Sequence, residues 1–233
     1  MPDLPRQLTL DLPLDPRFGP EDFLVGPSNE AAYARIESWP HWPDPVLVLT
    51  GPSGSGKSHL AAVWAAQSGA RTVGIAEVTG AAVPQLAEHP ALVIEDADRR
   101  SGRDEAALFH LLNLARERGT SLVITGAGAV EGWGIATPDL RSRLRLAPTV
   151  AIAPPDEALL RAVLVKLFVD RQLVVDTSVV DALALRIDRS LGRARDVVAA
   201  LDREGLARGR RITRPLALAT LASLDDSAGE GGP

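Results

Sequence analysis

Short apolar runs alternate with amphipathic stretches along residues 21–154. The runs have the length of buried strands, and they occupy residues 46–49, 71–76, 91–94, 121–124 and 149–153. Between two of them, residues 104–118 repeat apolar side chains at the spacing of one helix face. Strands that alternate with helices are typical of a parallel sheet covered on both faces. We therefore predict an α/β domain over residues 21–154, built on a five-stranded parallel sheet covered by helices.

After Pro155 the pattern changes to helices alone. Apolar residues recur at helical spacing over residues 156–172, 176–187, 190–208 and 215–224. We expect these segments to form a small all-helical lid domain over residues 155–224. An extended, proline-rich arm precedes the domains at residues 1–20, and residues 225–233 are expected to form a disordered tail.

The first strand leads into a match to the phosphate-binding loop pattern G-x-x-x-x-G-K-[ST], with a helix expected after it. Gly51, Gly54 and Gly56 allow positive φ, so that backbone N–H groups can turn toward phosphate oxygens. Lys57 can reach the outer phosphates of a nucleotide, and the Ser58 hydroxyl can ligate Mg²⁺. The nucleotide-binding candidates in this stretch are Gly51, Pro52, Ser53, Gly54, Ser55, Gly56, Lys57, Ser58 and His59.

Glu95 and Asp96 follow directly after the third apolar run. The carboxyl end of a buried strand is where a parallel sheet places its ligand crevice. One carboxylate there can hold Mg²⁺ through water, and the next can orient an attacking water. The usual order is Asp and then Glu, so by position Glu95 is the metal candidate and Asp96 the catalytic candidate. The exchanged side-chain lengths could displace the water, and a solvated acidic turn is the alternative interpretation.

Arg141, Arg143 and Arg145 lie close together before the fifth run. They form either a solvated basic loop or an arginine finger that is presented to the nucleotide of a neighbouring subunit. A planar, permanently charged guanidinium suits the charge that develops during phosphoryl transfer.

Three further residues are weaker nucleotide-binding candidates. Thr125 ends the fourth run and can sense a γ-phosphate. Phe23 and Val25 can pack on an adenine ring, although an ordinary place in the core explains them equally well.

Composition limits the classes of function. The chain has 233 residues and a formal net charge of −5, which argues against a broad electrostatic hold on nucleic acid. The absence of cysteine excludes disulfides and thiolate metal sites. The sequence shows no signal peptide and no apolar run near the ~18 residues of a membrane span. We expect a soluble, cytoplasmic protein that does not associate with membranes.

The amino-terminal arm contains alternating leucines at positions 8, 10 and 12. Alternation is typical of a strand, and an edge strand or disorder would account for it. The other interpretation is a linear peptide that docks in the apolar groove of a partner.

Together these segments resemble the AAA+ ATPases, and within them the DnaA branch. The resemblance covers roughly residues 20–222 and is carried by GPSGSGKSHL (51–60), LVIEDAD (92–98), DLRSRL (139–144), VAIAPPDEALLRAVL (150–164) and RARDVVAALDR (193–203). The chain stops where initiators of the DnaA type carry a DNA-binding domain. Gln7, Leu10 and Leu12 resemble the Q-x-x-L-x-L clamp-binding peptide of the regulatory inactivators of DnaA, the Hda family.

The resemblance implies a regulator of replication initiation that binds ADP or ATP with Mg²⁺. Such a protein docks on the DNA polymerase sliding clamp (β) and stimulates ATP hydrolysis by the DnaA initiator. The clamp-binding residues would be Gln7, Leu8, Leu10 and Leu12. Arg143 matches the finger that acts in trans, with Arg141 as the second choice.

The resemblance also assigns further positions and properties. Arg195 matches the sensor-2 arginine, with Arg193 as the alternative, and Thr125 lies near the sensor-1 position. The family implies weak or absent intrinsic ATPase activity, a homo-oligomer or dimer, and no sequence-specific DNA binding. An AAA+ motor or helicase-loader-like protein with its own ATP turnover is the alternative. A small-molecule P-loop kinase ranks last, because it gives no reason for DLRSRL, the lid arginine or the arm.

Overall fold

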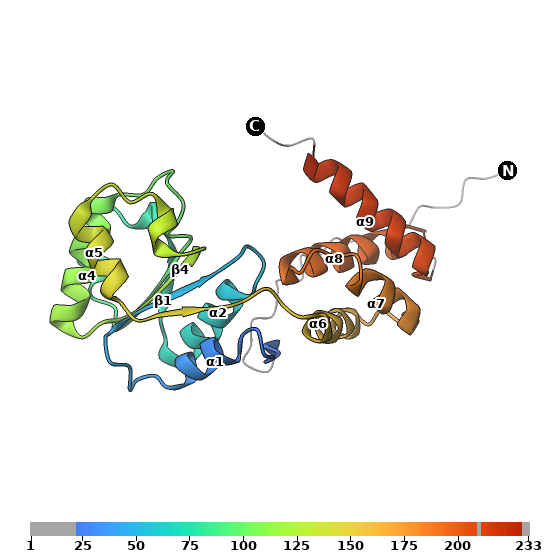
Figure 1. Ribbon diagram of the computed structural model, residues 1–233, viewed down its shortest axis with the longest axis horizontal. Coiled ribbons are helices and arrows are strands. Elements are labelled where there is room, and N and C mark those ends of the chain that lie inside the picture. Colours follow the sequence, from blue (N-terminus) through green and yellow to red (C-terminus); the bar gives the residue numbers. More distant parts are fainter. Residues whose placement is uncertain (1–21, 209–210, 230–233) are drawn as a thin grey trace, which may run out of the picture. The chain divides into compact units, whose positions relative to one another are not determined.

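A computed structural model describes residues 22–208 and 211–229 (Figure 1). Its strands are β1 (Val46–Gly51), β2 (Arg71–Gly74), β3 (Ala91–Glu95), β4 (Ser121–Ala127) and β5 (Thr149–Ala151). Its α-helices are α1 (Glu30–Glu37), α2 (Lys57–Ser68), α3 (Val83–Leu86), α4 (Glu105–Arg118), α5 (Pro138–Leu146), α6 (Glu157–Asp170), α7 (Thr177–Ala184), α8 (Leu191–Arg208) and α9 (Arg214–Gly229). Two short 3₁₀ helices are η2 (Ile75–Glu77) and η3 (Val130–Trp133). Within the described ranges, no helix is long and apolar enough to cross a membrane.

The strands form one five-stranded parallel sheet in the order β2-β3-β4-β1-β5, which confirms the predicted fold class. β4 lies between β1 and β3, and Leu49 of β1 is in register with Thr125 of β4. Because all strands run in the same direction, their carboxyl ends lie at one edge of the sheet. The loop after β1, the acidic end of β3 and Thr125 therefore gather at that edge.

Helices cover both faces of the sheet, and the alternation of side chains along β1 explains how. Val46 and Val48 belong to a buried cluster with residues of α4 and α5. Leu47 and Leu49 belong to a second buried cluster with residues of α1 and α2. Each of these four side chains is at most 1% exposed. A continuous apolar strand is therefore required, because both of its faces are covered.

The chain divides into two compact units. The sheet unit holds the described residues up to Leu159 together with Arg189–Gly192, and the lid unit holds Leu160–Asp188 and the described residues from Arg193 onward. The boundary thus falls inside α6, later than the predicted boundary after residue 154. Leu159 explains the difference, since its buried side chain lies against Gly26 of the sheet unit.

The lid unit is helical, as the loss of strand-like runs predicted. Its core includes buried residues of α6, α7 and α8, among them Phe168, Leu183 and Leu201, and α7 packs on α9. α9 runs to Gly229, beyond the predicted end of the lid domain at residue 224. Asp225 forms an ion pair with Arg193 of α8, which gives this last part of α9 a partner within the lid unit.

Candidate functional site

The phosphate-binding loop joins β1 to α2. Gly51, Gly54 and Gly56 have φ angles of 152°, 71° and 106°, which confirms the positive φ predicted for them. Since α2 begins at Lys57, the loop ends at the amino terminus of a helix, where backbone N–H groups and the helix dipole favour phosphate. The exposed loop residues are Pro52, Ser53 and Ser58, and the buried ones are Gly51 and Ser55.

Lys57 folds back over this loop. Its Nζ donates to two loop carbonyl oxygens, at 2.9 Å each. Burial lowers the pKa of the Lys57 ammonium from its ordinary value of 10.5, while the carboxylates of Asp98, Asp96 and Glu95 oppose that shift. The only charged donor on the loop is therefore held close to the backbone that would surround a phosphate.

A hydrogen-bonded cluster joins the ends of α2, β3 and β4. Ser58 Oγ donates to Glu95 Oε2 at 3.0 Å, and Thr125 Oγ1 donates to the same oxygen at 2.6 Å. Mg²⁺ prefers oxygen ligands, and in nucleotide sites it usually combines one or two carboxylates with phosphate oxygens and water. Ser58 and Glu95 lie together, as their predicted roles at a magnesium site require. If the ion is bound there, it supplies the charge that holds the outer phosphates.

Thr125 lies inside the hydrogen-bonded cluster of the acidic motif. Its side chain is fully buried. Its hydroxyl donates to Glu95 and accepts the Asp96 N–H at 3.1 Å, so both of its hydrogen-bonding roles are used within the acidic motif. A position near sensor 1 agrees with this placement beside the loop, and a contact with a γ-phosphate stays a prediction.

Asp96 differs from Glu95 in both backbone and side chain. Its φ is 58°, in the left-handed region that few non-glycine residues adopt. Its carboxylate forms an exposed ion pair with Arg99 at 3.0 Å. The catalytic role predicted for Asp96 therefore remains a prediction, and Arg99 competes for the same oxygens.

The two adenine candidates lie in different environments. Phe23 is buried in the core cluster beside α1 and α2, which agrees with the core interpretation. Its ring stacks on Tyr33, with the centroids 5.8 Å apart, and meets the His59 ring edge to face at 5.2 Å. Val25 is 47% exposed and stays a candidate for contact with a base.

The start of α8 contacts the phosphate-binding loop, although the sequence did not predict this contact. The N–H groups of Leu191 and Gly192 approach Gly54 O at 2.8 Å and 3.3 Å. A Cβ at Gly54 would collide with the Ser190 hydroxyl. Gly54 is therefore required both by its positive φ and by the close approach of a distant segment.

The two sensor-2 candidates lie on α8 within the lid unit. Arg193 pairs with Asp225 of α9, and Arg195 is half-buried. Their predicted role toward a nucleotide remains a prediction. The clamp-binding candidates Gln7, Leu8, Leu10 and Leu12 lie outside the described residues.

The arginine candidates lie on the helix α5 and not in a loop. Pro138 occupies the first turn of α5, where its missing N–H costs nothing. Leu140 and Leu144 are fully buried and anchor the helix. The spacing of these two leucines leaves the arginines between and beyond them on the exposed face.

The three arginines of α5 differ in their contacts. The Arg143 guanidinium lies 5.8 Å from the centre of the Phe109 ring, at cation–π distance. Arg145 forms an exposed ion pair with Glu131 at 3.2 Å. Arg141 is exposed, and its side chain makes no hydrogen bond or ion pair with another residue in the described ranges. On α5, Arg143 and Arg141 are therefore the arginines whose side chains form no ion pair with a carboxylate in these ranges.

A buried ion pair fixes the segment that leads into α5. Arg103, with a side chain only 3% exposed, pairs with Glu105 at 3.1 Å and donates to the carbonyl oxygens of Trp133 and Gly134. Glu105 accepts the N–H groups of Ala136 and Thr137 at 3.0 Å and 2.7 Å. No pattern in the sequence predicted this contact between the start of α4 and the start of α5.

The pKa of Glu105 makes this contact testable. Burial alone would raise the pKa, but hydrogen bonds from Thr137, Ala136 and Arg103 outweigh it and lower the pKa from 4.5 to about 2. Because the pKa of Glu105 is lower in the folded protein than in the unfolded chain, its ionised carboxylate stabilises the fold at pH values above about 4.5. This stabilisation is lost as the pH falls from about 4.5 toward 2.

We expect Glu105→Gln to lower the unfolding free energy at pH 7 by roughly 1–2 kcal/mol, because a charge-assisted network loses its anion. The difference from wild type should shrink on acidification below pH 4.5, as urea unfolding at several pH values would measure. Glu37→Gln, at an exposed position of α1, is the matched control and should unfold as wild type does. A Glu105 deficit that stays constant down to pH 3 would contradict the lowered pKa.

Comparisons with known proteins give a fold but no sequence family. No protein-family model and no curated protein matches the chain. Domain III of the Thermotoga maritima replication initiation protein DnaA superposes with a TM-score of 0.76 at 22% identity, over 91% of this chain and 98% of that one.

Two further solved structures have similar folds. AMPPCP-bound DnaA from Aquifex aeolicus has a TM-score of 0.64 at 20% identity, covering 84% of this chain and 68% of that one. A RuvB variant from Thermotoga maritima has a TM-score of 0.67 at 17% identity, covering 88% and 71%. With its phosphate-binding loop, acidic β3 end and five-stranded parallel sheet followed by a helical unit, the chain has the AAA+ fold that these DnaA and RuvB structures share.

Proposed function

We propose that this protein is a nucleotide-binding regulator of replication initiation. In this role it binds ADP or ATP with Mg²⁺, docks on the DNA polymerase sliding clamp, and stimulates ATP hydrolysis by DnaA through Arg143 in trans. The protein that receives the arginine is DnaA, whose own domain III has the same fold. Like subunits of this class are expected to associate, so a homo-oligomer or dimer is part of the proposal.

The observation that carries the proposal is the environment of Arg143. Its guanidinium lies on the exposed face of a helix anchored by buried leucines, makes no ion pair within the described ranges, and lies over the Phe109 ring. No ion pair has to break before it meets a phosphate of a second protein. Glu105 accepts two hydrogen bonds from the backbone that leads into α5, so the helix that carries Arg143 is already ordered. Less conformational freedom is therefore lost when the arginine binds.

The acidic motif supports a regulator more than a motor. Glu95 accepts hydrogen bonds from Ser58 and Thr125, and Asp96 pairs with Arg99. Both carboxylates therefore already have partners, and neither is free to activate a water. The proposal therefore includes weak or absent intrinsic hydrolysis, with the nucleotide acting as a switch that sets the shape of the protein.

An AAA+ motor is the second candidate, because a Thermotoga maritima RuvB described as a Holliday junction branch migration motor has a similar fold. Phosphate release discriminates between the two. We expect ATP-loaded DnaA to hydrolyse faster when this protein and DNA-loaded clamp are both present, and this protein alone to turn over little ATP. Rapid turnover by this protein alone, with no effect on DnaA, would favour the motor.

From the proposed clamp binding we derive a separate prediction for the amino-terminal arm, residues 1–20. Changing Gln7, Leu10 and Leu12 to Ala together should reduce co-elution with the clamp at least tenfold, because an extended peptide binds largely through its buried side chains. Thr9→Ala, within the same peptide but outside the Q-x-x-L-x-L positions, is the control. Unchanged co-elution of the triple variant would show that the arm does not bind the clamp.

A further inference from the structure

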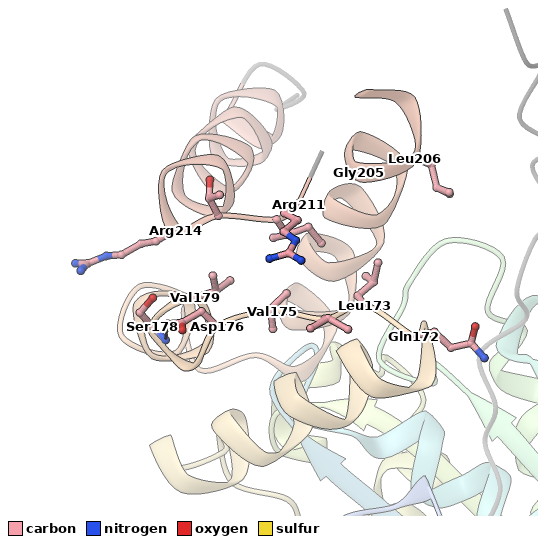
Figure 2. Close-up of a pocket in the computed structure, with 13 residues that line it drawn as sticks. Gln172, Leu173, Val175, Asp176, Ser178, Val179, Gly205, Leu206, Arg211 and Arg214 are labelled. Atoms are coloured by element: carbon pink, nitrogen blue, oxygen red, sulfur yellow. Dashed lines mark hydrogen bonds between the residues drawn. The ribbon is translucent and has the colours of Figure 1, made fainter. Parts of the chain in front are cut away.

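The lid unit has a groove of about 960 Å³ on its surface. Figure 2 shows it between the α6–α7 connection, the start of α7, the end of α8 and the start of α9. Its floor is apolar and includes Leu173, Val175 and Val179. At its edges Val174 is 92% exposed and Leu206 is 65% exposed. Large apolar side chains exposed together beside a groove indicate an interaction surface.

The charged groups of the groove favour an acidic occupant. Arg211 is exposed, and in Figure 2 its guanidinium extends over the groove toward Val175. Arg211 makes no hydrogen bond or ion pair with any other described residue. The lining acid, Asp176, is already used: its hydrogen bond with Ser178 at the start of α7 holds its pKa below the ordinary value. A carboxylate on the occupant would therefore meet a free arginine.

The groove does not suit single-stranded nucleic acid. None of its lining residues is aromatic, whereas proteins that bind single strands use aromatic side chains on which bases stack. An apolar floor lined by Arg211 and Arg214 instead suits an extended peptide with aliphatic side chains on one face and a carboxylate near its surface.

The chain's own amino-terminal segment has this chemistry. Leu8, Leu10, Leu12 and Leu14 alternate, so an extended backbone places them on one face, and Asp11 lies between them. Seven residues, 15–21, join this segment to the first described residue, Asp22, so Leu14 lies within about 30 Å of Asp22 even when they are fully extended. A short tether also provides an effective concentration of about 1 mM, so even a weak contact is well populated.

We propose that residues 8–14 of this chain dock in the lid groove, with the leucines on its apolar floor and Asp11 paired with Arg211. Leu8, Leu10 and Leu12 of this segment are also proposed to bind the sliding clamp. The segment can then occupy either the groove or the clamp, but not both at once. This competition rests on the proposed function, whereas the docking itself does not. The groove would hold the clamp-binding peptide until the clamp competes for it.

Disulfide trapping tests the docking directly, since the chain has no cysteine of its own. Thr9→Cys, which keeps every leucine, is combined with Val174→Cys at the groove. The matched control combines it with Val165→Cys, an exposed valine on α6 that does not line the groove. Mass spectrometry of the dilute, oxidised protein should show intramolecular disulfide at position 174 about tenfold faster than at position 165. Equal rates would overturn the docking.

Charge reversal and added clamp complete the test. Arg211→Glu should slow trapping roughly threefold or more, and Asp11→Arg in the same chain should restore it. Trapping that ignores both changes would overturn the pairing of Asp11 with Arg211. Added clamp should slow trapping at position 174. Selective trapping that the clamp leaves unchanged would overturn the clamp assignment, while the docking would stand.

Discussion

Replacing Arg143 with alanine should remove the stimulation of DnaA hydrolysis and leave nucleotide binding by this protein intact. Arginine fingers in nucleotide hydrolases contribute roughly 10³–10⁵ in rate, which corresponds to about 4–7 kcal/mol of transition-state stabilisation. The variant should fold normally, because Arg143 contributes an exposed cation–π contact with Phe109, which is worth about 0.5–1 kcal/mol. Phosphate release by DnaA with clamp present measures the first effect, and titration with a fluorescent ADP measures the second.

Two other arginines on α5 give matched controls. Arg145→Ala removes a guanidinium of the same helix that is already paired with Glu131, so it should retain nearly full stimulation. Arg141→Ala tests the second candidate for the finger. Arg143→Lys keeps the charge but loses the planar fork, so we expect it to recover little of the rate. Stimulation by Arg143→Ala within about tenfold of wild type would contradict the assignment.

The parts of the site that could be predicted from the sequence are formed by residues that are neighbours along the chain. The glycines of the phosphate-binding loop and the acidic end of β3 are short patterns, and a parallel sheet brings the ends of its strands together whatever the helices do. The apolar runs located the strands for the same reason, since β1 is covered on both faces and has no polar side to interrupt its pattern.

The contacts that the sequence could not predict join residues far apart in the chain. The contact of Leu191 with Gly54, and the ion pair that links Arg103 to the start of α5, depend on tertiary packing that no local spacing encodes. The length of α9 was missed for a related reason. Residues 225–229 are polar and glycine-containing, which locally predicts disorder, but the pairing of Asp225 with Arg193 is a tertiary contact that overrides local propensity.

Replacing Lys57 with alanine should weaken the binding of ADP and ATP by about 100-fold or more. A charge-assisted hydrogen bond to phosphate is worth about 1.5–3 kcal/mol, and a lysine at this position serves two phosphates. In the structure its Nζ bonds to the carbonyl oxygens of Gly51 and Pro52, so the ammonium already lies on the loop and needs little rearrangement to bind. Titration with a fluorescent nucleotide measures the loss.

Lys166→Ala is the matched control, because Lys166 is the chain's other lysine and pairs with Asp170 inside the lid unit. It should bind nucleotide as wild type does, and circular dichroism should show both variants folded. Under the proposed function Lys57→Ala should also lose the stimulation of DnaA even though Arg143 is intact, because the bound nucleotide sets the shape that presents the arginine. If Lys57→Ala binds no nucleotide but stimulates DnaA fully, Arg143 acts independently of the phosphate-binding loop. If Lys57→Ala binds nucleotide with wild-type affinity, the loop's role in binding phosphate is contradicted.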